Sequence, residues 1–210
     1  RSSAASDVYK RQDLEPGAPF NDVEMSQMIG ISRTPVREAV IQLSEESRII
    51  EIFPQRGMRI ALIDVELVEE ARFLRLVLEK AAVELVCGQA DEEDLRWLDE
   101  NIRLQEFYLE GGSSQKLLEL DNKMHRKLFS ICRKELTYEM CQRLAIHYDR
   151  IRSLSVATVK DHKIIEDHKK LLEAIRRRDK KQAAEIMELH LNRWMLNEQM
   201  FRNRYPAYFK

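Results

Sequence analysis

Four residues in the second half of the chain have the types and the spacing that a metal ion requires. Asp121 and His125, in DNKMH, stand four residues apart, so on a helix both side chains can reach one cation. His168 and His190 each lie 11 residues from Asp179, where we expect a turn between two helices. In an antiparallel helix pair both would then stand about 16 Å from the turn, because a helix rises about 1.5 Å per residue. Three histidines and one carboxylate can therefore converge inside a helical bundle.

Neutral imidazoles with one carboxylate suit zinc, nickel, manganese or iron, and the spacing does not choose among these divalent metals. An ordinary structural role is the alternative for any single histidine, and His147 and His162 fall outside the pattern. With an open coordination position the same four residues could activate water, as in a metal-dependent hydrolase-like enzyme. The sequence offers no general base or nucleophile paired with them, which favours a binding role. A plain helical interaction module is a third interpretation.

Two stretches without acidic residues, 31–37 and 54–60, suit contact with DNA. In the first, two arginines stand four residues apart at the start of an expected helix, where arginine can read guanine and free N–H groups can hold phosphate. In the second, arginines flank a glycine in a turn that could reach phosphates or a minor groove. The candidate DNA contacts on these stretches are Arg33, Thr34, Arg37, Arg56 and Gly57.

The overall charge neither requires nor excludes a nucleic-acid partner. The chain has a formal net charge of −1, and residues 1–62 hold eight Lys/Arg and nine Asp/Glu. Binding to DNA would therefore depend on the local placement of arginines and not on a basic domain. Three cysteines without a C-x-x-C pair indicate a reducing compartment, and no apolar run approaches the roughly 18 residues of a membrane span. We expect a cytoplasmic protein.

The elements that must position the first two stretches are a pair of short helices. Asn21 with Glu24 three residues later has the spacing of a capping box, and Gly30 stands where that helix should end. Ser32 is a good N-cap for a second helix over 33–46, whose first turn tolerates a proline. Two short helices joined around a glycine predict a helix-turn-helix.

A β-hairpin is predicted directly after this helix pair. Ile50 and Ile52, then Met58 and Ile60, alternate with polar residues on either side of the turn PQRG. A hairpin in this place is the wing of a winged helix-turn-helix.

The elements that must position the histidines are long helices. Apolar residues recur with helical spacing through the second part of the chain, and the breaks fall at CGQAD, EGGSS, CRKE, SVAT and around Asp179. The predicted helices are 64–87, 91–110, 114–131, 135–155, 159–178 and 180–203. The predicted fold is mainly α: a winged helix-turn-helix with a small β-hairpin wing, followed by an all-α antiparallel helical bundle.

The N-terminal stretches resemble a known DNA-binding domain. PGAPFNDVEMSQMIGISRTPVREAVIQLSEE followed by PQRGMRI, about residues 13–62, is similar to the winged helix-turn-helix of GntR-type bacterial transcription regulators, and SRTPVREA is its most specific part. The resemblance implies five contacts to DNA. The second helix would provide Arg33, Thr34 and Arg37, and the wing would provide Arg56 and Gly57. The sequence departs from the family where Glu46-Ser47-Arg48 replaces the usual Glu-Gly-Leu, and the family's first helix is missing.

The helical part resembles the FCD ligand-binding domain of the FadR subfamily. The matching pieces are FLRLVLEKAAVEL, LDNKMHRKLF, EDHKKLLEAI and MELHLNRW, and six helices are typical of the VanR-like group. The resemblance implies a bundle around a cavity that holds a divalent metal and a small carboxylate effector. Its metal ligands match Asp121, His125, His168 and His190, and Arg75 matches the position that faces the effector's carboxylate.

These observations together predict three segments and one function. Residues 1–12 lack apolar periodicity and are expected to be non-native or disordered, 13–63 to bind DNA, and 64–205 to bind the effector and to form a homodimer. We expect a sequence-specific transcription regulator, not an enzyme, that binds a palindromic DNA operator. A small carboxylate at the metal-containing pocket would modulate this binding.

Overall fold

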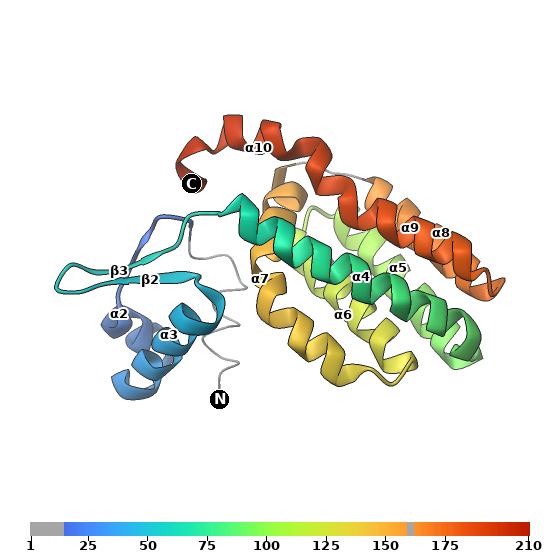
Figure 1. The fold of residues 1–210 in the computed structure, drawn as a ribbon, viewed down its shortest axis with the longest axis horizontal. Coiled ribbons are helices and arrows are strands. Elements are labelled where there is room, and N and C mark those ends of the chain that lie inside the picture. Colours follow the sequence, from blue (N-terminus) through green and yellow to red (C-terminus); the bar gives the residue numbers. More distant parts are fainter. Residues whose placement is uncertain (1–14, 159–161) are drawn as a thin grey trace. The chain divides into compact units, whose positions relative to one another are not determined.

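A computed structural model describes residues 15–158 and 162–210 of the chain (Figure 1). They form two compact units, one within Arg1–Glu66 and Arg202–Lys210 and the other within Leu67–Phe201. The expectations of a non-native segment at 1–12 and of an absent first helix concern residues outside this description. No described helix combines the length and the apolar character that crossing a bilayer would require.

The first helix pair begins and ends close to where the sequence predicts. Helix α2 spans Asp22–Ile29, and Gly30 after it adopts a left-handed conformation with φ 68°. Asn21 accepts a hydrogen bond from the Val23 backbone N–H at 2.9 Å, so it does cap the helix. The reciprocal half of the capping box is absent, because Glu24 accepts from the Asn21 side chain and not from its backbone.

Helix α3 spans Arg33–Ser47 and follows α2 after a short turn. Ser32 occupies the N-cap position, but its hydroxyl makes no capping hydrogen bond, which differs from the prediction. At the other end Arg48 takes the left-handed conformation, with φ 54°, that a glycine adopts more easily. The Ser47 hydroxyl donates to the Leu43 carbonyl at 2.7 Å. With Arg48 as its C-cap, the helix ends at Ser47 although Glu46-Ser47-Arg48 replaces Glu-Gly-Leu.

The predicted wing is present and belongs to a three-stranded antiparallel sheet. Strands β2, Ile50–Phe53, and β3, Gly57–Ile60, pair with Ile50 opposite Ile60. A third strand, β1, Pro19–Phe20, pairs with the other edge of β3 and gives the order β1-β3-β2. Two residues are too few to show an alternating pattern, so the sequence did not reveal β1.

The last residues of the chain return to the first unit. Ile63 and Phe209 form a parallel bridge, in which the Ile63 N–H donates to Tyr208 O at 2.7 Å. The Lys210 N–H donates to Ile63 O at 3.1 Å, and Lys210 Nζ lies 2.9 Å from Asp64 Oδ2. The chain therefore passes between the two units twice, once near Glu66 and once near Arg202.

The second unit is a bundle of long helices, and five of the six predicted segments agree with it to within a few residues. They are α4 (Val65–Gln89), α5 (Glu92–Glu110), α6 (Ser114–Ile131), α7 (Glu135–Thr158) and α8 (His162–Arg176); α9 (Lys180–Asn192) begins where the sixth segment does. Neighbours in contact include α5 with α6, α6 with α7, α5 with α8, and α8 with α9 (Figure 1). Antiparallel neighbours with short connections place side chains from distant parts of the sequence in one core.

The sixth predicted helix, 180–203, is wrong in its second half. Helix α9 ends at Asn192, a 3₁₀ segment, η1, runs over Arg193–Asn197, and helix α10 covers Glu198–Arg204. A 3₁₀ turn of five residues changes the helical period too little for sequence spacing to detect it.

Candidate metal centre and nucleic-acid interface

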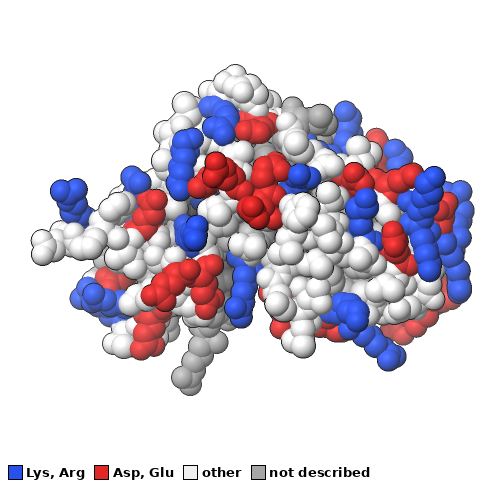
Figure 2. Space-filling model, viewed as in Figure 1, with Lys and Arg blue, Asp and Glu red and all other residues white. Residues whose placement is uncertain are grey.

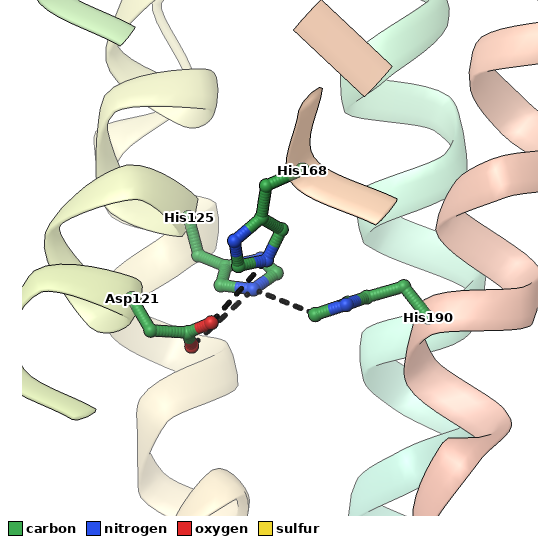
Figure 3. Close-up of side chains that lie close together, drawn as sticks. All are labelled: Asp121, His125, His168 and His190. Carbon is green, nitrogen blue, oxygen red and sulfur yellow. Dashed lines mark hydrogen bonds and ion pairs between the residues drawn. The ribbon is translucent and has the colours of Figure 1, made fainter. Parts of the chain in front are cut away.

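The four residues predicted to bind metal converge in the second unit (Figure 3). Each offers a ligand atom, and these atoms all lie within 4.8 Å of one another. Asp121 and His125 come from α6, His168 from α8 and His190 from α9. His125 and His168 are each 1 % exposed, and His190 keeps 10 % of its side-chain surface exposed. The site is therefore an interior one.

The convergence follows from the helical hairpin between α8 and α9. Arg178 adopts φ 57° in the turn, and Asp179 caps α9 by accepting from the Gln182 N–H at 3.0 Å. The two histidines, each 11 residues from Asp179, face each other with ring centroids 4.6 Å apart. The equal heights expected from helix rise are confirmed for His168 and His190.

The separations of the ligand atoms fit a shared ion. His125 Nε2 lies 3.3 Å from His190 Nε2 and 3.6 Å from Asp121 Oδ2, and His168 Nε2 lies 3.3 Å from Asp121 Oδ1. Ligands about 2.0–2.1 Å from one tetrahedral ion stand roughly 3.4 Å apart. His168 Nε2 is buried and has no hydrogen-bond partner among the described residues. An inward-facing nitrogen without a partner is what a metal ligand requires.

Burial favours the uncharged form of His168 and of His190. It lowers the pKa of His168 and of His190 well below the usual value, and the neighbouring histidine rings lower both further. A neutral imidazole has a free lone pair, which a protonated one lacks. The three imidazoles with one carboxylate thus form a donor set that suits a divalent transition metal, zinc, nickel, manganese or iron.

Each histidine faces a polar side chain with its Nδ1. His125 Nδ1 lies 2.5 Å from Glu79 Oε2, an ion-pair contact without regular hydrogen-bond geometry. His168 Nδ1 lies 2.9 Å from Gln105 Oε1, while His190 Nδ1 is 3.9 Å from Asp167 Oδ2, beyond hydrogen-bond distance. Such partners orient metal-binding histidines. Helical spacing alone gave no sign of Glu79, Gln105 or Asp167, because all three come from other helices or other faces.

Arg75, the residue expected to face an effector, is engaged elsewhere. Its Nε lies 2.6 Å from Glu79 Oε1, and its guanidinium stacks over the Tyr148 ring at 5.0 Å. Burial raises the pKa of Glu79, but Arg75 and His125 outweigh it and lower that pKa to about 2. Arg75 does not line the cavity beside the metal ligands, although Tyr148 does. Arg75 and Glu79, one helical turn apart on α4, thus form a buried ion pair next to His125.

A cavity of about 490 Å³, counted with the solvent at its mouth, opens beside the cluster. Its lining combines Asp121 and His190 with two arginines, a tyrosine, a serine and four apolar side chains: Arg152, Arg193, Tyr148, Ser155, Leu117, Leu118, Val156 and Ile164. Arg152 binds Asp121 and lies 2.6 Å from Asp149 Oδ1, and Arg193 lies 2.6 Å from Asp167 Oδ1. The two cavity arginines were not among the sequence candidates. His147 is buried outside this lining, and His162 is exposed.

The five predicted DNA contacts are all exposed in the first unit. Arg33 Nε donates to Asp22 Oδ2 at 3.0 Å, which fixes the arginine at the start of α3 and leaves its two terminal amino groups for other contacts. Arg37 and Arg56 form no ion pair with any residue that the structure describes. Arg59 lies 2.5 Å from Glu51 and stacks on Phe53, so this wing arginine is less available.

Charges of both signs are interspersed over the face seen in Figure 2, and the formal net charge of the chain is −1. Figure 2 shows Lys and Arg side chains beside Asp and Glu over most of the visible face, with basic side chains at the tip of the β2–β3 hairpin. This face shows no broad basic patch, so any contact with DNA through it would depend on local arginines.

Comparison with known proteins assigns the chain to a family. The FCD domain family matches residues 70–193, which include all four clustered residues. The chain belongs to the FCD family of GntR-type transcription regulators. It is 29% identical over 179 residues to the HTH-type transcriptional repressor RspR of Escherichia coli, covering 85% of this chain and 78% of RspR. Identity is 27% to the uncharacterized HTH-type regulator YdhC of Bacillus subtilis, over 85% of this chain and 80% of YdhC.

Solved structures agree with the fold assignment. Escherichia coli McbR/YncC superposes with a TM-score of 0.82, covering 97% of this chain and 98% of McbR, at 19% identity. A GntR regulator from Rhodococcus sp. RHA1 superposes with a TM-score of 0.74 over 91% of this chain and 92% of its own, at 18% identity. The predicted winged helix-turn-helix and helical bundle are thus confirmed as a regulator fold.

Proposed function

We propose that this FCD regulator binds an operator sequence through α3 and the wing, and that a divalent metal with a small carboxylate effector modulates this binding. The observation that carries the proposal is the buried cluster of Asp121 and three histidines beside a cavity that holds two arginines. A cation site and two guanidinium groups at one cavity are a chemistry suited to carboxylates.

The DNA-contacting part of the proposal rests on the exposed start of α3. Arg37 is exposed and without an ion pair in the described part of the chain, so its guanidinium can form a bidentate contact to a guanine. Thr34 lies beside it on the first turn, and Arg33 is held close by Asp22. Arg56 and Gly57 at the turn of the hairpin would contact phosphates or a minor groove.

The effector part rests on the charges around the cavity. A metal held by Asp121, His125, His168 and His190 would supply a Lewis-acidic position for a carboxylate oxygen. Arg152 and Arg193 line the same cavity, and each is bound to aspartates that an anionic ligand would compete with. Arg75 would contribute from behind the Tyr148 ring, on which its guanidinium stacks. Its Nη1 is buried and has no hydrogen-bond partner among the described residues, so this nitrogen could donate to a ligand.

A homodimer is the proposed working form. Phe73 and Val77 stand one turn apart on α4 and are 61% and 51% exposed, which is unusual for such apolar side chains. A second copy of the chain on this face would bury them and would present two recognition helices to a palindromic operator. The bacterial cytoplasm is where such an operator is found.

The alternative, a metal-dependent hydrolase, finds less support at the same site. A general base is needed beside the metal to take a proton from water. The two outer carboxylates near the histidines, Glu79 and Asp167, are each bound to an arginine, Arg75 and Arg193. The pairing with Arg75 lowers the pKa of Glu79, which makes this carboxylate a weak base. The named relatives are transcriptional regulators.

The experiment compares two histidine variants of the same helix. His168→Ala removes a clustered ligand, whereas His162→Ala changes an exposed histidine at the start of α8. We expect His168→Ala to lose bound metal by elemental analysis while remaining folded, and His162→Ala to keep it. Binding of each protein to DNA upstream of its own gene, followed by fluorescence anisotropy with and without Zn²⁺ and candidate carboxylates, tests the regulation. Full metal retention in His168→Ala, or an operator affinity that neither metal nor carboxylate changes, would contradict the proposal.

A further inference from the structure

His168 lies at the end of a chain of buried hydrogen bonds that runs through α5. Asn101 Nδ2 donates to the Leu120 carbonyl at 3.2 Å, and Gln105 Nε2 donates to Asn101 Oδ1 at 2.6 Å. Gln105 Oε1 then lies 2.9 Å from His168 Nδ1. Asn101 is 4% exposed, Gln105 0% and His168 1%, so bulk water does not compete for these groups.

The chain of hydrogen bonds has a fixed direction because its first acceptor cannot donate. The Leu120 carbonyl only accepts, so Asn101 must turn its amino group to it and its oxygen to Gln105. Gln105 must then present its amino group to Asn101, and the same group faces Met124 Sδ at 3.8 Å, a second acceptor. Only its oxygen is left for His168. Reversing either amide would bring two acceptors or two donors together.

We propose that Asn101 and Gln105 are positioning residues that hold His168 in the tautomer with its proton on Nδ1. Gln105 Oε1 accepts that proton in a hydrogen bond, and Nε2 keeps its lone pair toward the cluster, 3.3 Å from Asp121 Oδ1. The inference rests on the proposed metal site and deepens it, because it states which nitrogen of His168 is ready to bind the ion. A fixed tautomer removes a rearrangement that binding would otherwise require.

The other two histidines are held differently. His125 faces a carboxylate, Glu79, which adds a negative charge to the site. His190 Nδ1 lies 3.9 Å from Asp167 Oδ2, and the Asp167 carboxylate accepts hydrogen bonds from Arg193 instead. Gln105 thus fixes one ligand without adding another buried charge, and burying a charge costs far more than burying a paired amide. The effect of Gln105 on His168 can therefore be measured separately from the contacts that hold His125 and His190.

The test begins with the metal-free wild-type protein. Long-range ¹H–¹⁵N spectra of the imidazole groups distinguish a protonated ring nitrogen from one with a free lone pair, and His168→Ala identifies the His168 signals. We expect the proton of His168 on Nδ1. A proton on Nε2 would overturn the proposal, whether or not the protein binds metal.

Two variants then separate positioning from packing. Gln105→Leu keeps the volume but removes the acceptor, and we expect the Nδ1 proton preference to disappear and Zn²⁺ affinity to fall about 10–100-fold. Gln105→Glu offers an acceptor to Nδ1 as a carboxylate or as an acid, and we expect it to keep the tautomer and most of the affinity. Equal losses in both variants with an unchanged tautomer would mean that Gln105 only packs, which also overturns the proposal.

The two levels of inference fail in distinguishable ways. If the wild-type protein binds neither Zn²⁺ nor Ni²⁺ in calorimetry, the metal part of the proposed function is wrong, while the metal-free spectrum still decides the tautomer. If metal binds and the tautomer is on Nε2, the proposed function stands and the positioning role fails. The wild-type spectrum decides the matter even where Gln105→Leu does not fold.

Discussion

The two units of this regulator keep their functional charges in opposite environments. In the helical unit Arg75 and Glu79 each have 3% of the side chain exposed and bind each other, beside histidines that are also buried. In the first unit Arg33 has 57% of its side chain exposed, and Arg37 and Arg56 are exposed as well. The same residue type, arginine, is a structural partner in one unit and a surface cation in the other.

The difference fits the ligand that we propose for each site. A small ion is held by ligands that are already desolvated and oriented, so every buried charge around it needs a fixed partner. DNA presents its phosphates to an exposed surface, so useful arginines stay hydrated and free until the complex forms. Removing a buried arginine should therefore cost folding stability, and removing an exposed one should cost DNA affinity.

The largest expected effect is the loss of stability in Arg75→Ala. This change leaves Glu79 as an unpaired buried carboxylate, and we expect it to lower the free energy of unfolding by about 3–5 kcal/mol. Arg103→Ala is the matched control: Arg103 pairs with Asp99 at the same four-residue spacing and 2.8 Å, but is 77% exposed. Its loss should be about 0.3–0.5 kcal/mol. Urea unfolding measures both, and similar losses would contradict the contrast between a buried and an exposed arginine.

A smaller effect, on DNA affinity, is expected for Arg37→Ala. Losing one bidentate base contact typically costs about 1–3 kcal/mol and relaxes the choice of base at that position. Fluorescence anisotropy with the operator and with single-base variants measures this, and metal content and unfolding stability should stay at wild-type values. Arg103→Ala again serves as the control. Unchanged operator affinity in Arg37→Ala would remove this residue from the recognition surface.

The smallest effect is expected for Arg56→Ala at the wing turn. A phosphate contact carries no sequence information, so binding should weaken by a similar factor for operator and unrelated DNA. The slope of log affinity against log salt concentration should fall by about one. Titrations at several salt concentrations measure this slope. A change in base preference with an unchanged slope would instead indicate that Arg56 reads a base.

Much of the fold could be predicted because local rules act within a few residues. Asn21 and Gly30 bound α2, and the alternation around PQRG gave the β2–β3 hairpin. Local patterns failed where the partner is distant or the segment is short. The two-residue β1 pairs with β3, and Phe209 bridges to Ile63 across most of the chain length. The 3₁₀ segment after Asn192 also lacks a period that spacing could detect.

The candidate site divides in the same way. The spacing of Asp121 and His125, and the equal distances of His168 and His190 from one turn, were enough to bring four ligands together, because helix rise and period are fixed. Arg152 and Arg193 could not be anticipated, since which surface of a helix lines a cavity depends on its neighbours. For the same reason the expected placement of Arg75 did not anticipate its burial against Glu79 and Tyr148.

The sequence by itself determined most of the helices, the wing, the family and the four residues of the candidate metal site, because these depend on periods and motifs carried by neighbouring residues. Only the tertiary structure decided what surrounds that cluster: Glu79, Gln105 and Asp167 behind the histidines, and the arginines beside them. Burial and hydrogen-bond direction arise where separate helices pack together. Burial and hydrogen-bond direction set the charge of a side chain and the position of its proton, whereas the sequence gives only the residue type.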